Sequence, residues 1–182
     1  MNSIKKGFIV IALMILLFLI FKSSFYRFYF DSKEHWILRD KIIWTENTKL
    51  NWSNFKNVEN DGDLYPKVGL SSRFNVNDPI LFRSHTVFIP KESYVSDTTE
   101  NLNLRIAQFK FDLLETYRRK MVKKVDSLRK IGYSDLKPSD FETMTESYYK
   151  LFDKEWERYI SLKMDLDTFK RAEEKIRIEL RK

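Results

Sequence analysis

The side chains best suited to chemistry are few in this chain of 182 residues. It contains two histidines, His35 and His85, and no cysteine. A catalytic zinc site needs three protein ligands around an open position, so two histidines are not enough. Asp112 and Glu115 lie three residues apart, but carboxylates alone suit Mg²⁺ or Ca²⁺ better than zinc. We therefore expect no metal and no cofactor.

Other catalytic patterns are also missing from the sequence. It has no Gly-rich phosphate loop, no nucleophile elbow and no Ser/His/Asp arrangement. The absence of cysteine excludes disulfides and thiolate zinc sites. The chain is more simply interpreted as a protein without enzymatic activity, although a hydrolase with a different site stays an alternative.

The net charge of +7 is unevenly divided along the chain. Residues 1–30 contain no acidic residue, and their basic residues are Lys5, Lys6, Lys22 and Arg27. Residues 31–182 contain 29 basic and 26 acidic residues, a surplus of only three. A nucleic-acid binder concentrates basic residues on one face, so we expect no nucleic-acid partner.

Alternating apolar residues predict strands between Trp36 and Pro90. Two such series, residues 68–76 and 80–89, flank the turn residues 77–79 (NDP) and predict an antiparallel hairpin. Residues 42–44 and 50–52 are shorter strand candidates.

After Pro90 apolar residues recur every three or four positions, which predicts helices. One stripe runs from Leu102 to Ile131, and a second begins at Phe141 and continues to Leu180, with a break near Asp165 left open. Strands followed by helices, without alternation, predict an α+β fold in which a small antiparallel sheet is packed by two long C-terminal helices.

Capping residues mark the predicted ends of these helices. Asp97 with Glu100 predicts the N-cap of the first helix, and Gly132 its end. Ser139 with Glu142 forms a capping-box pattern at the start of the second helix.

The N-terminal segment predicts a membrane anchor. Lys5 and Lys6 precede an uncharged apolar run of 15 residues, Gly7 to Phe21, and aromatic residues come after it. No small-x-small cleavage pattern is present beyond the run, which favours an uncleaved transmembrane signal-anchor over residues 1–30; a cleaved signal peptide is the alternative. The short basic N-terminus favours export of the soluble domain, residues 31–182, to a periplasmic or extracellular location.

Three short motifs resemble a bacterial family of predicted secreted, zinc-dependent proteases, a domain of unknown function. Residues 50–55 (LNWSNF) resemble its Leu-x-Trp-x-Asp-Phe stretch, with Asn54 in place of the usual Asp. Residues 88–95 (FIPKESYV) resemble its Phe-x-Pro-x-x-Ser-Trp-Val strand end. Residues 108–120 (QFKFDLLETYRRK) resemble the second half of its His-Glu-Gln-x-His-Phe-Asp-Ile helix and the residues just after that motif.

The resemblance implies a zincin-like domain that has lost its zinc motif. In such a helix, histidines four residues apart share a zinc ion, and the intervening glutamate takes a proton from the bound water. Aligned on Gln108, these three positions are Ile106, Ala107 and Lys110. None of them can play those roles. The possible retained structural or binding residues are Gln108, Asp112, Glu115, Tyr117 and Arg119.

These observations favour a membrane-anchored, non-catalytic binding or scaffolding protein, resembling an inactive zinc protease, with a protein partner. The first alternative is a structural subunit whose helices after Ser139 pack into an oligomer or a membrane complex, since their apolar stripe is long for a small domain to bury alone. The second alternative is a hydrolase that uses a non-zinc site.

Overall fold

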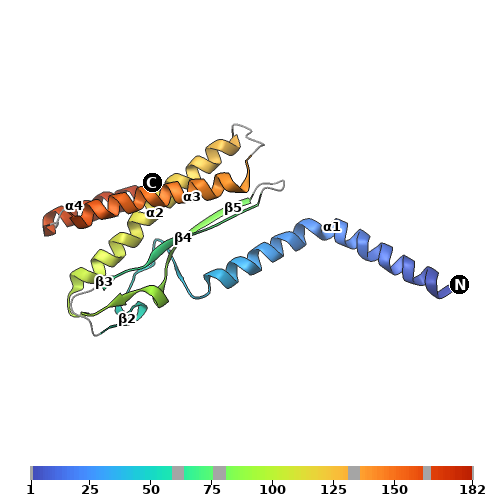
Figure 1. Cartoon of the computed structure of the whole chain (residues 1–182), viewed down its shortest axis with the longest axis horizontal. Helices are drawn as coiled ribbons and strands as arrows, with labels where there is room; N and C mark the ends of the chain where they lie inside the picture. Colours follow the sequence, from blue (N-terminus) through green and yellow to red (C-terminus); the bar gives the residue numbers. More distant parts are fainter. Residues whose placement is uncertain (1, 59–63, 76–80, 131–135, 162–164, 182) are drawn as a thin grey trace. The chain divides into compact units, whose positions relative to one another are not determined.

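The computed structural model describes residues 2–58, 64–75, 81–130, 136–161 and 165–181. The chain divides into two compact units, residues 1–39 and residues 40–182, which are described separately (Figure 1).

The first unit consists of one helix, α1 (Asn2–Leu38). Within the described ranges, no helix is both long and apolar enough to cross a membrane, so the predicted transmembrane helix is wrong. The uncharged run of 15 residues from Gly7 to Phe21 measures about 22 Å as a helix, whereas a hydrocarbon core is about 30 Å thick. Lys22 and Arg27 then interrupt the aromatic continuation on which the prediction relied.

The second unit is built on a three-stranded antiparallel sheet of order β1–β5–β4. β4 (Val68–Asn75) and β5 (Leu81–Phe88) pair along their whole lengths, which confirms the predicted hairpin. The predicted turn, residues 77–79, lies outside the described residues. β1 (Ile42–Ile43) pairs with β5 and confirms the first of the shorter strand candidates.

The second shorter candidate, residues 50–52, is not a strand. Trp52–Asn54 form a 3₁₀ turn, η1. The Asn51 side chain accepts a hydrogen bond from the Ser53 N–H at 3.0 Å, and the Asn54 side chain accepts one from the Asn51 N–H at 2.9 Å. Such local side-chain hydrogen bonds compete with strand pairing, which the alternation of apolar residues could not reveal.

A second, smaller sheet has the order β2–β6–β3. β6 (Tyr94–Val95) comes after a 3₁₀ turn, η2 (Pro90–Glu92). It pairs in parallel with β2 (Lys56–Asn57) and antiparallel with β3 (Leu64–Tyr65).

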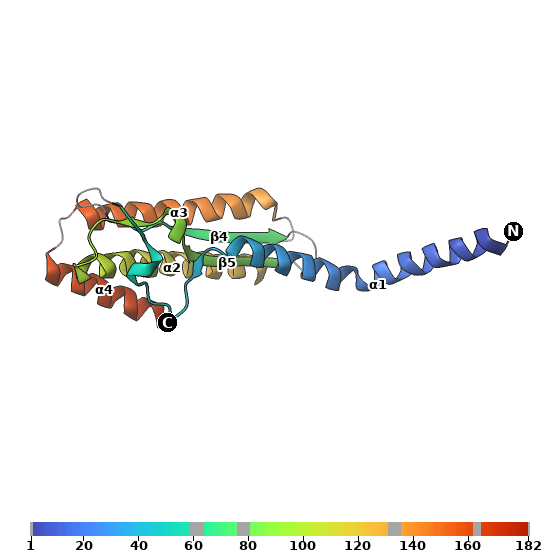
Figure 2. The same ribbon diagram turned by 90° about the horizontal axis from the view of Figure 1, so that it is seen from below.

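Three helices come after the strands: α2 (Asn101–Lys130), α3 (Pro138–Ser161) and α4 (Leu166–Leu180). α2 lies between α3 and α4 (Figure 2). The second apolar stripe is divided at Asp165, whose side chain accepts hydrogen bonds from the N–H groups of Asp167 and Thr168, each at 2.9 Å, and so caps α4.

The two predicted N-caps are wrong. Asp97 accepts a hydrogen bond from the Thr99 N–H at 2.7 Å, in a turn that precedes α2. α3 begins at Pro138, so Ser139 lies inside its first turn, and the Asp140 carboxylate accepts the hydrogen bond from the Lys137 N–H at 2.8 Å. Gly132, the predicted end of the first helix, lies outside the described residues.

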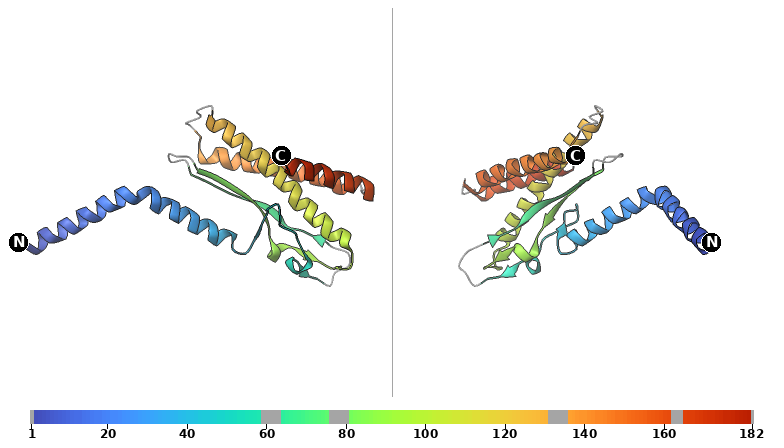
Figure 3. Two further views of the ribbon diagram at one scale, coloured as in Figure 1. Left: turned by 180° about the vertical axis from the view of Figure 1, so that it is seen from behind. Right: turned by 45° about the vertical axis from the view of Figure 1, so that its right-hand side comes forward.

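The helices lie on one side of the longer sheet, and this packing confirms an α+β fold (Figure 3). The core residues come from the strands and from all three helices; the fully or nearly fully buried ones include Val68, Phe88, Phe111, Leu114, Phe152, Phe169 and Ile176. Most described residues of the stripe on α3 and α4 are thus buried within the unit itself, although Leu166 is half exposed. The length of the stripe therefore no longer supports the alternative of an oligomerisation partner.

Candidate functional site

The three positions that the resemblance assigns to a zinc motif are occupied by side chains that pack against the rest of the unit. Ala107 is fully buried, and Ile106 packs against the core. The Lys110 ammonium lies 4.9 Å from the ring centroid of Trp156 and 5.7 Å from that of Tyr65. Cation–π contacts of this kind stabilise the charged side chain. Burial lowers the pKa of Lys110, and the charge of Asp153 opposes that effect.

No metal site replaces the missing motif within the described part of the chain. It contains no group of three His, Cys, Asp or Glu side chains that could hold a metal ion. His35 lies in α1 and His85 in β5, so the two histidines belong to different units.

Gln108 and Asp112 hold the loop of residues 44–50 against α2. Trp44 donates its indole N–H to Asp112 Oδ1 at 2.7 Å, and the Gln108 amide donates to the same oxygen at 2.8 Å. Gln108 also accepts a hydrogen bond from the backbone N–H of Leu50 at 2.9 Å. Burial raises the pKa of Asp112 even though both hydrogen bonds favour the carboxylate. Gln108 and Asp112, which the resemblance marks as possibly retained, therefore hold this loop in place.

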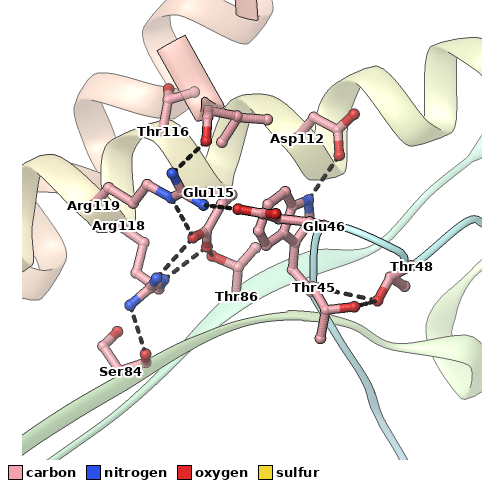
Figure 4. Close-up of polar contacts among 12 residues, drawn as sticks. Thr45, Glu46, Thr48, Ser84, Thr86, Asp112, Glu115, Thr116, Arg118 and Arg119 are labelled. Carbon is pink, nitrogen blue, oxygen red and sulfur yellow. Dashed lines mark hydrogen bonds and ion pairs between the residues drawn. The ribbon is translucent and has the colours of Figure 1, made fainter. Parts of the chain in front are cut away.

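Glu115 is the most buried ionisable group of this region, with only 2% of its side chain exposed. Figure 4 shows Arg118 and Arg119 converging on it. Arg118 donates two hydrogen bonds to the carboxylate, each at 2.7 Å, Arg119 donates one at 3.0 Å and the Thr86 hydroxyl donates one at 2.8 Å. Burial would raise the pKa of Glu115, but the hydrogen bonds and charge of Arg118, with those of Thr86 and Arg119, hold it below its ordinary value.

The two arginines extend this cluster to three further segments. Arg118 donates to the backbone carbonyl of Ser84 in β5 at 2.9 Å. Arg119 donates to the carbonyl of Leu180, the last residue of α4, at 2.5 Å, and lies 3.8 Å from Glu46 in the loop. Glu115 thus joins α2 to the sheet, to α4 and to the loop of residues 44–50.

Tyr117 joins α2 to α3. Its hydroxyl donates a hydrogen bond to Glu155, which also accepts one from Tyr159 at 3.2 Å. Burial and the Glu155 carboxylate raise the pKa of Tyr117. The phenol therefore stays protonated as a donor and is unsuited to act as a base.

A hollow of about 1010 Å³ lies on the second unit and has the form of a groove. It is lined by the loop of residues 44–50 and by residues 170–181, in α4 and just after it, which we call its walls. The first part of α2, Asn101 to Asp112, also lines it, and we call this part its floor. The apolar side chains of the floor and lower walls include Leu104, Phe109, Ile176 and Leu180. We call this hollow the groove.

All four carboxylates that line the groove have partners within the chain. Asp112 is bound by Trp44 and Gln108. The other three contact arginines: Glu46 with Arg119, Glu173 with Arg105, and Glu174 with Arg177. A general base or a metal ligand needs a lone pair directed at the substrate or the metal, whereas each of these carboxylates has at least one oxygen directed at a side chain of the same molecule.

Sequence reasoning missed Trp44 and Arg118, which complete the two clusters. Trp44 binds a residue 68 positions away, and no local pattern encodes such a contact. Comparison with protein-family models, curated proteins and solved structures finds no match. The resemblance to the zinc-dependent proteases therefore stays a prediction.

Proposed function

We propose that this chain is a non-catalytic binding protein that holds a polypeptide segment in the groove. The observation that carries the proposal is that every carboxylate of the groove is engaged by a side chain of the same molecule. The groove is thus equipped to bind rather than to transfer protons or to hold a metal. A resemblance to the zinc-dependent proteases would then extend to the fold but not to the catalytic activity.

The loop that forms one wall supports a polypeptide as the ligand. Within the described part of the chain, the backbone N–H groups of Glu46, Asn47 and Lys49 donate no hydrogen bond. An extended segment could accept from them while its apolar side chains reach the floor beside Leu104, as in other modes of peptide recognition that combine backbone and pocket contacts.

Site-directed photo-crosslinking in the native host tests the proposal. A photoreactive phenylalanine analogue at Asn47 should yield a discrete protein adduct, and the same analogue at Lys154, an exposed residue of α3 outside the groove, should not. Filling the floor by Leu104→Trp should abolish the Asn47 adduct. The matched control Leu151→Trp, at a half-exposed position on α3, should leave it intact. Adducts of equal yield at both labelled positions would contradict a groove-specific partner.

The absence of turnover can be tested separately. After dialysis of the purified chain against zinc, we expect neither tightly held metal by elemental analysis nor cleavage of casein. About one equivalent of zinc together with chelator-sensitive cleavage would show a working site built from other residues, and would restore the hydrolase alternative.

We also propose that α1 attaches the chain to a membrane, with the second unit outside the cytoplasm. The described apolar side chains between Phe8 and Phe18, such as Ile11 and Met14, are more than half exposed. Exposing this much apolar surface of one helix to water is energetically unfavourable, whereas lipid would cover it. The chain should sediment with the membrane fraction, and protease added to spheroplasts should digest the second unit. Recovery of the chain in the soluble fraction would contradict attachment, and protection from protease would reverse the orientation.

A further inference from the structure

The second half of α2, Arg118 to Lys130, is far more basic than the rest of the unit. It contains seven basic residues and one acidic residue, Asp126. This surplus of six is twice the surplus of three in residues 31–182 as a whole. The remainder of that region is therefore net acidic, and the near balance of the total conceals a local concentration of positive charge.

Four lysines of this segment share the solvent-facing side of α2; they are Lys120, Lys123, Lys124 and Lys130, and we call them the lysine face. They recur at helical spacing, opposite the buried Met121 and Val125. The four lysines span about 15 Å along the helix axis. Lys120 contacts Glu179 at 3.3 Å. The other three lysines form no ion pair with any residue that the structure describes.

A hollow of about 440 Å³ lies beside this face. Four basic side chains line it, those of Arg118, Arg119, Lys120 and Lys123, and the one acidic side chain there is Glu179. Glu115 pairs with both arginines and Glu179 with Lys120, but the four cations still outnumber these two carboxylates. The hollow therefore carries a positive surplus and has room for a small anionic group such as a phosphate.

The helix dipole accounts for only part of this arrangement. Cations are stabilised near the C-terminus of a helix, but the effect falls off within the last turn. Lys130 lies in that turn. Lys120, Lys123 and Lys124 lie earlier in the helix, and the dipole gives no reason for their concentration on one side.

We propose that the lysine face binds the anionic headgroups of a lipid bilayer. Its charge complements phosphate groups, and the same chain carries the exposed apolar surface of α1. α1 ends at Leu38 and the second unit begins at Asp40, so attachment of α1 would keep the unit close to the lipid surface. Even weak electrostatic contacts are effective at the high local concentration that such tethering creates.

Sedimentation with vesicles tests the proposal on residues 40–182, whose core consists only of their own side chains. Omitting α1 removes its contribution to binding. Phosphatidylcholine vesicles that contain phosphatidylglycerol should bind the unit, and vesicles of phosphatidylcholine alone should not. Binding should be lost when salt is raised from about 0.1 M to about 0.5 M, because screening shortens the range of the attraction.

Matched variants separate the lysine face from the net charge. Lys123→Gln/Lys124→Gln should weaken binding roughly 25-fold, about fivefold for each lysine, and Lys123→Glu/Lys124→Glu should weaken it further. The control Lys154→Gln/Lys175→Gln alters exposed lysines of α3 and α4 and changes the net charge equally. It should bind like the wild type. Circular dichroism verifies that each variant is folded.

Three results would overturn the proposal. One is equal binding to both kinds of vesicle, and another is an equal loss of binding in the control variant. The third is binding of labelled single-stranded DNA as tight as that of the anionic vesicles at the same salt, which would make the face a general polyanion site.

Discussion

The two halves of α2 differ in where their polar and charged side chains lie and in what these side chains contact. In the first half, up to Tyr117, the polar side chains turn inward: Gln108, Asp112 and Glu115 are held by side chains or backbone groups from other segments. In the second half, lysines such as Lys123 and Lys124 face solvent and lack an ion-pair partner among the described residues. One helix thus secures the fold at one end and offers a charged surface at the other.

This difference bears on how function should be assigned. A buried polar group that is fully hydrogen-bonded stabilises one arrangement of the chain, so its presence alone does not indicate catalysis. A concentration of exposed like charges that the fold does not use is a better guide to a binding surface. Substitutions in each half test this comparison, from the largest expected effect on stability to the smallest.

Glu115→Ala should produce the largest loss of stability. It leaves Arg118 and Arg119 without the carboxylate that neutralises them, and removing one partner of a buried ion pair lowers the free energy of unfolding by about 3–5 kcal/mol. Urea denaturation measures the change. Glu146→Ala is the control, since it breaks an exposed ion pair with Lys150 on α3 and should have a far smaller effect. Similar losses in both variants would show that Glu115 does not organise the fold.

Trp44→Phe should have a moderate effect that is concentrated in the loop. An aromatic ring is retained but the N–H that binds Asp112 is lost, and losing a hydrogen bond to a charged group lowers stability by about 1.5–3 kcal/mol. Hydrogen exchange of the Leu50 amide, which donates to Gln108 in the same network, should accelerate more than exchange in β5. Uniform acceleration would mean that Trp44 stabilises the unit generally and does not lock the loop.

Asp112 and Glu115 should contribute to the pH dependence of stability with opposite signs. The pKa of Asp112 is raised above its ordinary value of 3.8, so its stabilising contribution is full below that value and is lost as pH rises through the folded-state pKa. The pKa of Glu115 is lowered from 4.5, so its contribution is full above that value and is lost as pH falls through the folded-state pKa.

Difference curves isolate these two contributions. The stability of the wild type minus that of Asp112→Asn should fall with rising pH, and the same difference for Glu115→Gln should fall with decreasing pH. Each slope is at most about 1.4 kcal/mol per pH unit for a single proton. Curves of the same sign would mean that one of the two hydrogen-bond networks is misassigned.

Much of the fold was predictable because it depends on local periodicity. The hairpin of β4 and β5 and the extent of α2 are both encoded in the spacing of apolar residues. Boundaries were less predictable, since they depend on single hydrogen bonds. Asn51 turns a predicted strand into a 3₁₀ turn, and Asp140, not Glu142, accepts the hydrogen bond from the residue that precedes α3. The predicted transmembrane helix was wrong because aromatic residues were counted as part of a span that Lys22 interrupts.

The candidate site was predictable only in part. The segment around Gln108 and Glu115 drew attention through its resemblance to a known helix, and the structure shows both residues making long-range contacts. The groove depends on α4 and the loop of residues 44–50 meeting across α2, which no spacing along the chain indicates. The net charge of residues 31–182 also concealed the lysine face, because the positive charge of the second half of α2 is largely cancelled in that sum by acidic residues elsewhere.

The smallest effect on stability is expected from Lys123→Ala/Lys124→Ala. Both side chains are exposed and form no ion pair with a described residue, and surface substitutions of this kind usually change the free energy of unfolding by less than about 0.5 kcal/mol. Alanine also has the higher helix propensity, and removing two adjacent charges relieves repulsion along the helix, so a slight gain in stability is expected. Urea denaturation at low and high salt measures both contributions, because salt screens the repulsion and should reduce the gain. Glu115→Ala and this variant together define the comparison between the two halves of α2. A marked loss of stability in the lysine variant would mean that Lys123 and Lys124 also stabilise the fold, and the lysine face would then need no partner outside the chain to explain it.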